Sequence, residues 1–324
     1  MKHVTLGASA LKVPAICLGT MTFGEQVGEA TAHRILDRSV ERGVNFLDTA
    51  EMYAVPASAE TCGATETFIG NWFAKHPGAR QKLVLATKVA GPSRGMPWIR
   101  EGSGMTGQDI LNACDGSLRR LQTDVIDLYQ IHWPEPPEDI DEGWDTLVRL
   151  KAEGKVRWIG VSNFSAAQME QVGRLGPITS LQPPYSMVRR EIEGEILPHC
   201  ERNQIGVLAY SPMQSGLLTG GWTRARVEAL PTDDWRREKN KHFQEPLFSR
   251  NLRLVELLKE IGEPHGKTPG EVAIAWTLRL PVVTAAIVGA RKPGQLKGLI
   301  GAADWRLRGE ECGKIEEFLK ANPE

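Results

Sequence analysis

Short apolar runs alternate with segments of helical periodicity along almost the whole chain. The runs lack the polar alternation of a half-exposed strand, so we expect buried strands. They cover residues 15–19, 44–48, 83–88, 125–132, 156–162, 180–182, 206–210 and 285–288. Helical patterns follow over 30–42, 66–75, 107–121, 140–152, 166–175, 192–202 and, after the last run, 293–300. Eight strand-then-helix units predict an α/β fold, a (β/α)8 TIM barrel with parallel strands. The alternative is an open doubly wound sheet, which needs a topological switch point that nothing in the sequence marks.

Several segments do not follow this alternation of strands and helices. Residues 4–6 and 11–13 flank a small-residue turn and predict an N-terminal β-hairpin. Residues 211–248 are too many for an ordinary strand-to-helix loop, and loops of that length are usually functional or mobile. After the seventh strand, two helices are predicted over 252–261 and 270–278 where one would suffice, and an extra amphipathic helix is predicted over 310–320.

Composition narrows the class of protein without naming an activity. The chain has 324 residues, a formal net charge of -1 and 41% hydrophobic residues, which fits one barrel domain over 1–324. The near-neutral charge gives no reason to expect a nucleic-acid or membrane partner, and no apolar run is long enough to span a bilayer. Five widely spaced cysteines without a CxxC motif predict reduced thiols and a cytoplasmic protein. The sequence leaves the oligomeric state open.

Four polar residues fall at or just after the ends of the second, third and fourth predicted strands. They are Asp48, Tyr53, Lys88 and His132. Taken alone, Asp48 could cap a turn, Tyr53 could lie on the surface and His132 could be a satisfied core histidine. Lys88 at the end of a buried strand needs a carboxylate partner. Because the strand ends of a parallel barrel meet at one mouth, where ligands bind, the four together predict an active site.

These residue types suit the reduction of a carbonyl group. A phenol with a pKa of about 10 is a weak acid near neutrality, and a nearby ammonium lowers that pKa. We expect Asp48 to keep Lys88 protonated and Lys88 to lower the pKa of Tyr53. Tyr53 then protonates the carbonyl oxygen as hydride reaches the carbon, while neutral His132 orients that oxygen. This chemistry needs no metal.

The four residues, in this order and context, resemble the catalytic tetrad of the aldo-keto reductase superfamily. Further motifs extend the resemblance over nearly the whole chain: Leu18-Gly19-Thr20-Met21-Thr22-Phe23-Gly24, Phe46-Leu47-Asp48-Thr49-Ala50, Gly160-Val161-Ser162-Asn163-Phe164, Gln182-Pro183-Pro184-Tyr185-Ser186, Ala209-Tyr210-Ser211-Pro212 and Val288-Gly289-Ala290-Arg291. The N-terminal half, with its long insert over 53–63, is most similar to the bacterial Tas-like branch. The resemblance implies an NADPH-dependent oxidoreductase that reduces aldehydes or ketones to alcohols.

The resemblance also implies that NAD(P)H lies extended across the barrel mouth. Ser162, Asn163 and Gln182 are the implied partners of the nicotinamide carboxamide, and Tyr210 is expected to stack on the ring. The other implied contacts are Gly19, Thr20, Met21 and Asp48 near the first strands, Ser211, Pro212, Gly216 and Leu218 at the pyrophosphate, and Gly289, Arg291, Lys292 and Gln295 at the adenine end.

The adenine end carries the prediction of cofactor choice. Arg291 and Lys292 place two cations beside a predicted helix N-terminus, which favours a 2′-phosphate and therefore NADPH over NADH. Their alternative role is that of an exposed basic loop. Where many members of the superfamily carry an acidic residue and asparagine, this chain has Gly298 and Leu299, which leaves Gln295 as the remaining polar partner for adenine.

Residues 102–107 match the dinucleotide fingerprint GxGxxG, but we reject it as a nucleotide site. No strand immediately precedes the motif, as the fingerprint requires. Thr106 and Asp109 instead have the spacing of a helix N-cap.

Aromatic and apolar residues on the mouth loops predict a substrate pocket without a committed charge. Besides Tyr53 and His132, the candidates are Phe23, Met52, Trp98, Trp133 and Trp222, each of which could equally be a packing residue. Such a pocket suits small-molecule aldehydes, ketones or dicarbonyls, and the reverse oxidation of an alcohol or sugar stays open.

Two other functions also stay open. One is a lyase with a Schiff base on Lys88, which Asp48 opposes by raising the lysine pKa. The other is an NADP(H)-binding regulatory subunit with little turnover.

Overall fold

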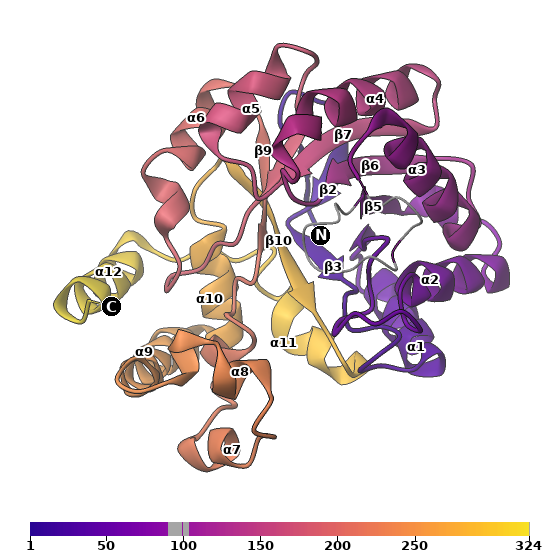
Figure 1. Ribbon diagram of the computed structural model, residues 1–324. Coiled ribbons are helices and arrows are strands. Elements are labelled where there is room, and N and C mark those ends of the chain that lie inside the picture. Colours follow the sequence, from indigo (N-terminus) through magenta and orange to yellow (C-terminus); the bar gives the residue numbers. More distant parts are fainter. Residues whose placement is uncertain (90–98, 100–103, 324) are drawn as a thin grey trace.

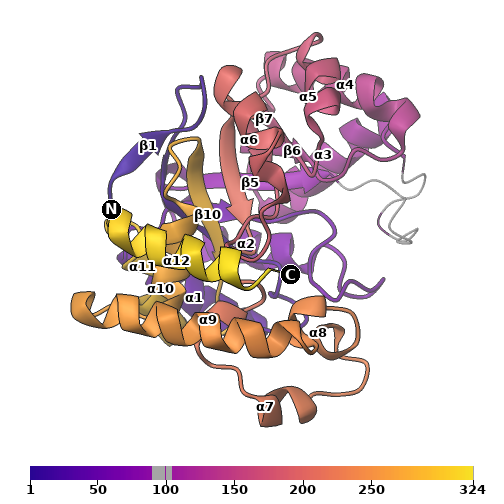
Figure 2. The same ribbon diagram turned by 90° about the vertical axis from the view of Figure 1, so that its left-hand side faces the viewer.

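A computed structural model describes residues 1–89, 99 and 104–323 of the chain (Figures 1 and 2). Within these residues, parallel strands close into a barrel in the order β10-β3-β4-β5-β6-β7-β8-β9, which confirms the predicted (β/α)8 fold. The strands are β3 (Ile16–Gly19), β4 (Phe46–Asp48), β5 (Val84–Val89), β6 (Ile126–Ile131), β7 (Val156–Ser162), β8 (Ser180–Gln182), β9 (Gly206–Tyr210) and β10 (Val283–Gly289). Each lies within about two residues of its predicted bounds.

Helices cover the outside of the barrel, as Figure 1 shows. They are α1 (Glu29–Glu41), α2 (Ala64–Lys75), α3 (Gly107–Leu121), α4 (Ile140–Ala152), α5 (Ala166–Gly173), α6 (Ile196–Arg202), α9 (Leu247–Gly262), α10 (Pro269–Thr277), α11 (Lys297–Ile300) and α12 (Gly309–Ala321). Thr106 caps α3 in a capping box with Asp109, as expected, while residues 102 and 103 of the GxGxxG match lie outside the described residues.

The strands are apolar on both faces because each face packs into a separate core. One core fills the barrel and contains Cys17, Phe46 and Leu128 among others. The larger core lies between the strands and the surrounding helices. Burial on both sides explains why the strands read as continuous apolar runs in the sequence.

The predicted N-terminal hairpin is present and closes the bottom of the barrel. Strand β1 (His3–Thr5) pairs antiparallel with β2 (Lys12–Pro14), and Leu6 beyond β1 belongs to the barrel core. Gly7 has φ +55°, and a Cβ there would lie 2.6 Å from the carbonyl oxygen of Thr179. Only glycine therefore lets the hairpin approach the starts of β8 and β9 so closely.

The structure differs from the sequence predictions in two regions. The helix expected over 192–202 is divided into a 3-10 turn, η4 (Glu191–Glu193), and α6. Pro198 explains the break, because proline fits the first turn of α6 but would disrupt the interior of a longer helix. The long segment 211–248 is not a bare loop: it contains η5 (Leu217–Thr219), α7 (Arg224–Glu228), α8 (Trp235–Glu238) and η6 (Lys241–Phe243).

We call residues 211–248 the excursion. It leaves the barrel after β9 and projects beside α9, and α12 lies along α9 on the same side of the molecule (Figures 1 and 2). No helix in the described part of the chain is long and apolar enough to cross a membrane. All five cysteines are free thiols, as the sequence predicts.

Candidate active site

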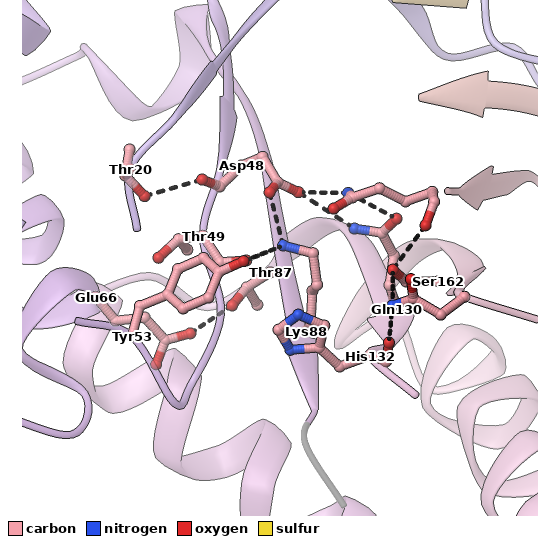
Figure 3. Close-up of polar contacts among 12 residues, drawn as sticks. Thr20, Asp48, Thr49, Tyr53, Glu66, Thr87, Lys88, Gln130, His132 and Ser162 are labelled. Atoms are coloured by element: carbon pink, nitrogen blue, oxygen red, sulfur yellow. Dashed lines mark hydrogen bonds and ion pairs between the residues drawn. The ribbon is translucent and has the colours of Figure 1, made fainter. Parts of the chain in front are cut away.

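The parallel register brings the four predicted polar residues together at the C-terminal mouth. Asp48 ends β4 and pairs with Ala86, two positions before Lys88 on β5. His132 follows β6 directly, and its backbone N–H continues the ladder to β5. Tyr53 lies in the loop after β4 and points toward the lysine (Figure 3). The side chains come from three neighbouring strand ends, as the sequence predicts.

Lys88 lies between Asp48 and Tyr53 and contacts both. Its Nζ donates to Asp48 Oδ1 at 2.6 Å and to the Thr49 carbonyl at 2.8 Å, and lies 3.5 Å from the Tyr53 hydroxyl. The lysine and the aspartate are both buried. Burial lowers the pKa of Lys88, but the Asp48 carboxylate and the Tyr53 hydroxyl together outweigh this effect, so the pKa is raised. A lysine held as the ammonium is a poor amine nucleophile, which opposes the Schiff-base alternative.

The expected pKa shift of Tyr53 was wrong in direction. Burial raises the pKa of the phenol, and this effect exceeds the lowering by the nearby Lys88 ammonium, while Asp48 raises the pKa further. The sequence identified the cation but gave no measure of how thoroughly the phenol is desolvated. Tyr53 therefore keeps its proton at neutral pH, which is the state that a general acid requires.

His132 lies against the phenol with its ring fixed from both sides. The centroids of its ring and that of Tyr53 are 5.7 Å apart at 76°, an edge-on arrangement. On its other face, His132 stacks on Trp133 at 3.7 Å. A substrate oxygen that approaches Tyr53 thus meets the imidazole edge as well, where a ring N–H can donate.

The four residues expected at the nicotinamide form one connected set. Ser162 Oγ donates to the Gln182 carbonyl at 2.8 Å, and Asn163 Nδ2 donates to the His132 carbonyl at 2.9 Å. The Tyr210 hydroxyl donates to Asn163 Oδ1 at 2.9 Å. Gln182 Nε2 donates to Asp48 Oδ2 at 2.9 Å, which links this set to the four catalytic candidates.

The predicted contacts on β3 lie beside the same mouth. Gly19 pairs with Asp48 on one side and Gly289 on the other. Thr20 is buried, and its hydroxyl donates to the Asp48 carbonyl at 2.9 Å. Met21, two residues after the end of β3, is exposed to solvent.

The start of the excursion has the backbone of an anion-binding loop. Ser211, Gln214 and Ser215 have φ of 55°, 46° and 54°, and Gly216 has 84°. Consecutive backbone N–H groups in such turns can form an anion-binding concavity. Some of the N–H groups are already used within the segment, because Gln214 donates to the Ser211 carbonyl and Leu218 to the Met213 carbonyl. Pro212 is buried, and Leu218 is fully buried in the main core, so neither the side chain nor the N–H of Leu218 is available to a ligand.

At the adenine end, Gln295 has a structural role that the sequence did not predict. Its Oε1 accepts from the backbone N–H of Arg291 at 2.7 Å and of Lys292 at 3.0 Å, so it caps the turn η8 (Pro293–Leu296). The Gln295 amide oxygen is thereby occupied by these two backbone N–H groups and is not presented to adenine. Arg291 and Lys292 are both exposed.

Two further arginines, which the sequence does not mark, lie near Arg291. Arg226 and Arg236, both in the excursion, lie 4.1 and 5.2 Å from the centroid of the Trp222 ring. Partial burial, then the charge of Arg236 and less strongly that of Arg226, lowers the pKa of Arg291, against an opposing effect of Asp234. Asp234 is also the ion-pair partner of Arg236. Three guanidinium groups thus interact around Arg291, where Asp234 pairs with Arg236, and positive charge gathered in this way suits an anion. No motif marks them, because they become neighbours only through the path of the excursion.

The aromatic residues expected around the substrate separate into two groups. Trp133 packs with Met52, Tyr53 and Ile99 beside the mouth, so these residues form an apolar wall next to the catalytic candidates. Phe23 is not part of this wall, because it is fully buried in the main core. Trp222 packs on Phe243 and Phe248 within the excursion. Trp98 lies outside the described residues.

Comparison with known proteins agrees with this architecture. The family model described as "Aldo/keto reductase family" matches residues 15–320. Protein tas of Escherichia coli is 36% identical over 98% of this chain and 97% of its own length. Aldo-keto reductase YhdN of Bacillus subtilis is 34% identical over 99% and 94%. The solved structure of a glycerol dehydrogenase from Gluconobacter oxydans superposes with a TM-score of 0.85 at 31% identity, covering 99% of this chain and 97% of that one.

The full-length similarity and the placement of the four polar residues at the barrel mouth lead to one conclusion. The chain belongs to the aldo/keto reductase family and is an NAD(P)H-dependent oxidoreductase.

Proposed function

We propose that the protein reduces small aldehydes and ketones to alcohols with NADPH, with Tyr53 as the general acid. The observation that carries this proposal is the polar chain from buried Asp48 and Lys88 to half-buried Tyr53, with 2.6 and 3.5 Å between successive polar atoms. It ends on a protonated phenol at the barrel mouth, where a substrate oxygen can reach it. Cys17 also has a raised pKa and interacts with Lys88, but it is fully buried in the core inside the barrel.

The residues present fit a nicotinamide cofactor. When bound, the cofactor supplies hydride to the carbonyl carbon. Ser162, Asn163 and Gln182 offer amide and hydroxyl groups for a carboxamide, and Tyr210 offers a half-buried ring for stacking. The left-handed backbone at the start of the excursion offers N–H groups for a pyrophosphate.

In this mechanism the protein orients the carbonyl and moves one proton. His132 donates a hydrogen bond to the carbonyl oxygen and sets its direction relative to Tyr53. Tyr53 transfers its hydroxyl proton to that oxygen as negative charge develops there. The Lys88 ammonium, held by Asp48, stabilises the phenolate that remains.

The charge around Arg291 supports NADPH over NADH. Arg226, Arg236 and Arg291 bring three positive charges to this place, and the carboxylate of Asp234 pairs with Arg236. A 2′-phosphate brings up to two negative charges and accepts from several guanidinium N–H groups at once. The hydroxyl of NADH offers no such charge.

The apolar wall of Met52, Ile99 and Trp133 supports an uncharged substrate. The glycerol dehydrogenase among the structural relatives makes oxidation of a small polyol the second direction to test. The free cysteines accord with a reducing compartment, so the cytoplasm stays our proposed location.

A titration tests the proposal. NADPH is added to the purified protein while its tryptophan fluorescence is followed, and a panel of aldehydes and ketones is then mixed with the complex. Saturable binding followed by loss of dihydronicotinamide absorbance supports the proposal. Saturable binding without turnover on any carbonyl or alcohol points to the regulatory alternative, and no binding contradicts the proposed cofactor site.

A further inference from the structure

The Asp48 carboxylate has a second oxygen that Lys88 does not use. Oδ2 accepts from Gln182 Nε2 at 2.9 Å and, at the long end of hydrogen-bond range, from Gln130 Nε2 at 3.5 Å (Figure 3). Gln130 is fully buried, and the chemistry proposed above gives it no role. A buried amide costs about 1–3 kcal/mol when its hydrogen bonds are missing, so its presence calls for a reason.

The barrel is shaped to hold the Gln130 side chain. In the register of β6, Gln130 lies between Lys88 of β5 and Gly160 of β7. Strand alternation puts it on the same face as His132, two positions along. A Cβ at Gly160 would lie 3.4 Å from Gln130 Cγ and 2.4 Å from Ser180 Oγ. Glycine thus avoids a clash with Ser180, and the Gln130 side chain packs directly against the backbone of β7.

Gln130 also contacts the amide of Gln182. Gln182 Nε2 lies 3.4 Å from Gln130 Oε1, so its two N–H groups face Asp48 and Gln130. The reversed amide would set the Gln182 oxygen against the Asp48 carboxylate, with no proton between two acceptors. Gln182 Oε1 accepts no hydrogen bond from the residues that the structure describes, and so it stays available to a ligand.

We propose that Gln130 is a positioning residue that fixes the Gln182 amide with its carbonyl oxygen presented to the cofactor. The inference rests on the proposed nicotinamide site. The fixed carbonyl oxygen of Gln182 can accept a hydrogen bond from the NH2 group of a carboxamide. It cannot accept one from the methyl group that a methyl ketone carries at the same position. Gln130 thereby sets which group the protein accepts at position 3 of the nicotinamide ring, without touching the cofactor.

The test compares NADPH with its 3-acetylpyridine analogue, in which a methyl group replaces the carboxamide NH2. Fluorescence titration gives a dissociation constant for each ligand. We expect the wild-type protein to prefer NADPH by about five- to tenfold, the effect of one hydrogen bond. Gln130→Met removes both amide contacts and should reduce that preference to about twofold or less. Leu128→Met is the matched control, because Leu128 is buried on the same face of β6 and belongs to the apolar barrel core.

Gln130→Glu tests the same point if the methionine variant does not fold. A protonated carboxyl keeps one donor and one acceptor, whereas an ionised one sets a second negative charge beside Asp48. The other titratable groups at this place are Lys88 on β5, Cys17 on β3 and Tyr53 in the loop after β4, which interact with Asp48. The preference for NADPH should be kept at low pH and lost as the pH rises through the new carboxyl group's pKa.

The outcomes separate the inference from the proposed function. If Gln130→Met, or Gln130→Glu at every pH, keeps the wild-type preference, the inference is overturned. If the wild type binds both ligands equally, Gln182 does not read the carboxamide and the inference is overturned as well. If the wild type binds neither ligand, the proposed cofactor site is at fault.

Discussion

At the scale of single residues, the pairing of Asp48 with Lys88 is the feature with the largest energetic consequence. Lys88 is fully buried and Asp48 nearly so, and they lie 2.6 Å apart. Asp48→Asn leaves a buried ammonium without its counter-charge, and loss of one partner of such a pair typically costs about 3–5 kcal/mol. We expect that decrease in the free energy of unfolding, measured by urea denaturation.

The double variant Asp48→Asn/Lys88→Met is the control for this prediction. It removes the stranded charge, so it should recover at least half of the stability that the single variant loses. A double variant as unstable as the sum of the two single variants would show that the two side chains do not interact.

The protonation of Tyr53 predicts a pH profile. Its pKa is raised above the ordinary value, chiefly by burial and against the effect of Lys88. Reduction needs the protonated phenol, which is present below that pKa and lost as the pH rises through it. We therefore expect kcat/KM for carbonyl reduction to show no decline from Tyr53 between pH 6 and about 9. Measurement in buffers of constant ionic strength tests this, and a decline centred below about 8 that disappears in Tyr53→Phe would contradict it.

At the scale of elements, the strands were the most predictable part and side-chain networks the least. The apolar runs placed each strand to within about two residues, because strands buried on both faces leave a continuous signal. The tetrad followed from polar residues at strand ends. Gln130 was missed because one amide inside an apolar run gives no hint of its partner. Arg236 was missed because its proximity to Arg291 depends on the path of the excursion.

The excursion is an element in its own right, and its small core predicts how it can be loosened. Trp222 is 7% exposed and packs on Phe243 and Phe248, whereas Trp235 in the same segment is 54% exposed. Trp222→Ala should destabilise this segment by about 3 kcal/mol and remove the ring on which Arg226 and Arg236 lie. Limited proteolysis within 223–243 should become faster, and NADPH binding should weaken.

Trp235→Ala is the matched control, since an exposed ring contributes little packing. It should leave both proteolysis and NADPH binding close to the wild type. Equal effects of the two substitutions would show that the Trp222 core does not hold the excursion in place.

At the scale of the whole molecule, the proposed cofactor site joins segments far apart in the sequence. The nicotinamide candidates lie at the ends of β7, β8 and β9, and the anion candidates come from the excursion and from the end of β10. The barrel makes them neighbours because all strand ends meet at one mouth.

Arg236→Gln tests whether the excursion takes part in cofactor choice. NADPH affinity should fall about tenfold, the effect of one charged hydrogen bond, while NADH affinity stays the same. Equal losses for both nucleotides would mean that Arg236 supports the fold of the segment instead of reading a phosphate.

The central claim is that Tyr53 delivers the proton, and the most direct measurement is the single-turnover rate of Tyr53→Phe. The variant keeps the ring and its contact with His132, so binding of NADPH by fluorescence should be unchanged within about twofold. The rate of dihydronicotinamide oxidation by a saturating aldehyde should fall by about 10² to 10⁴, the usual contribution of a general acid. A rate within threefold of the wild type, with binding intact, would show that another group protonates the substrate.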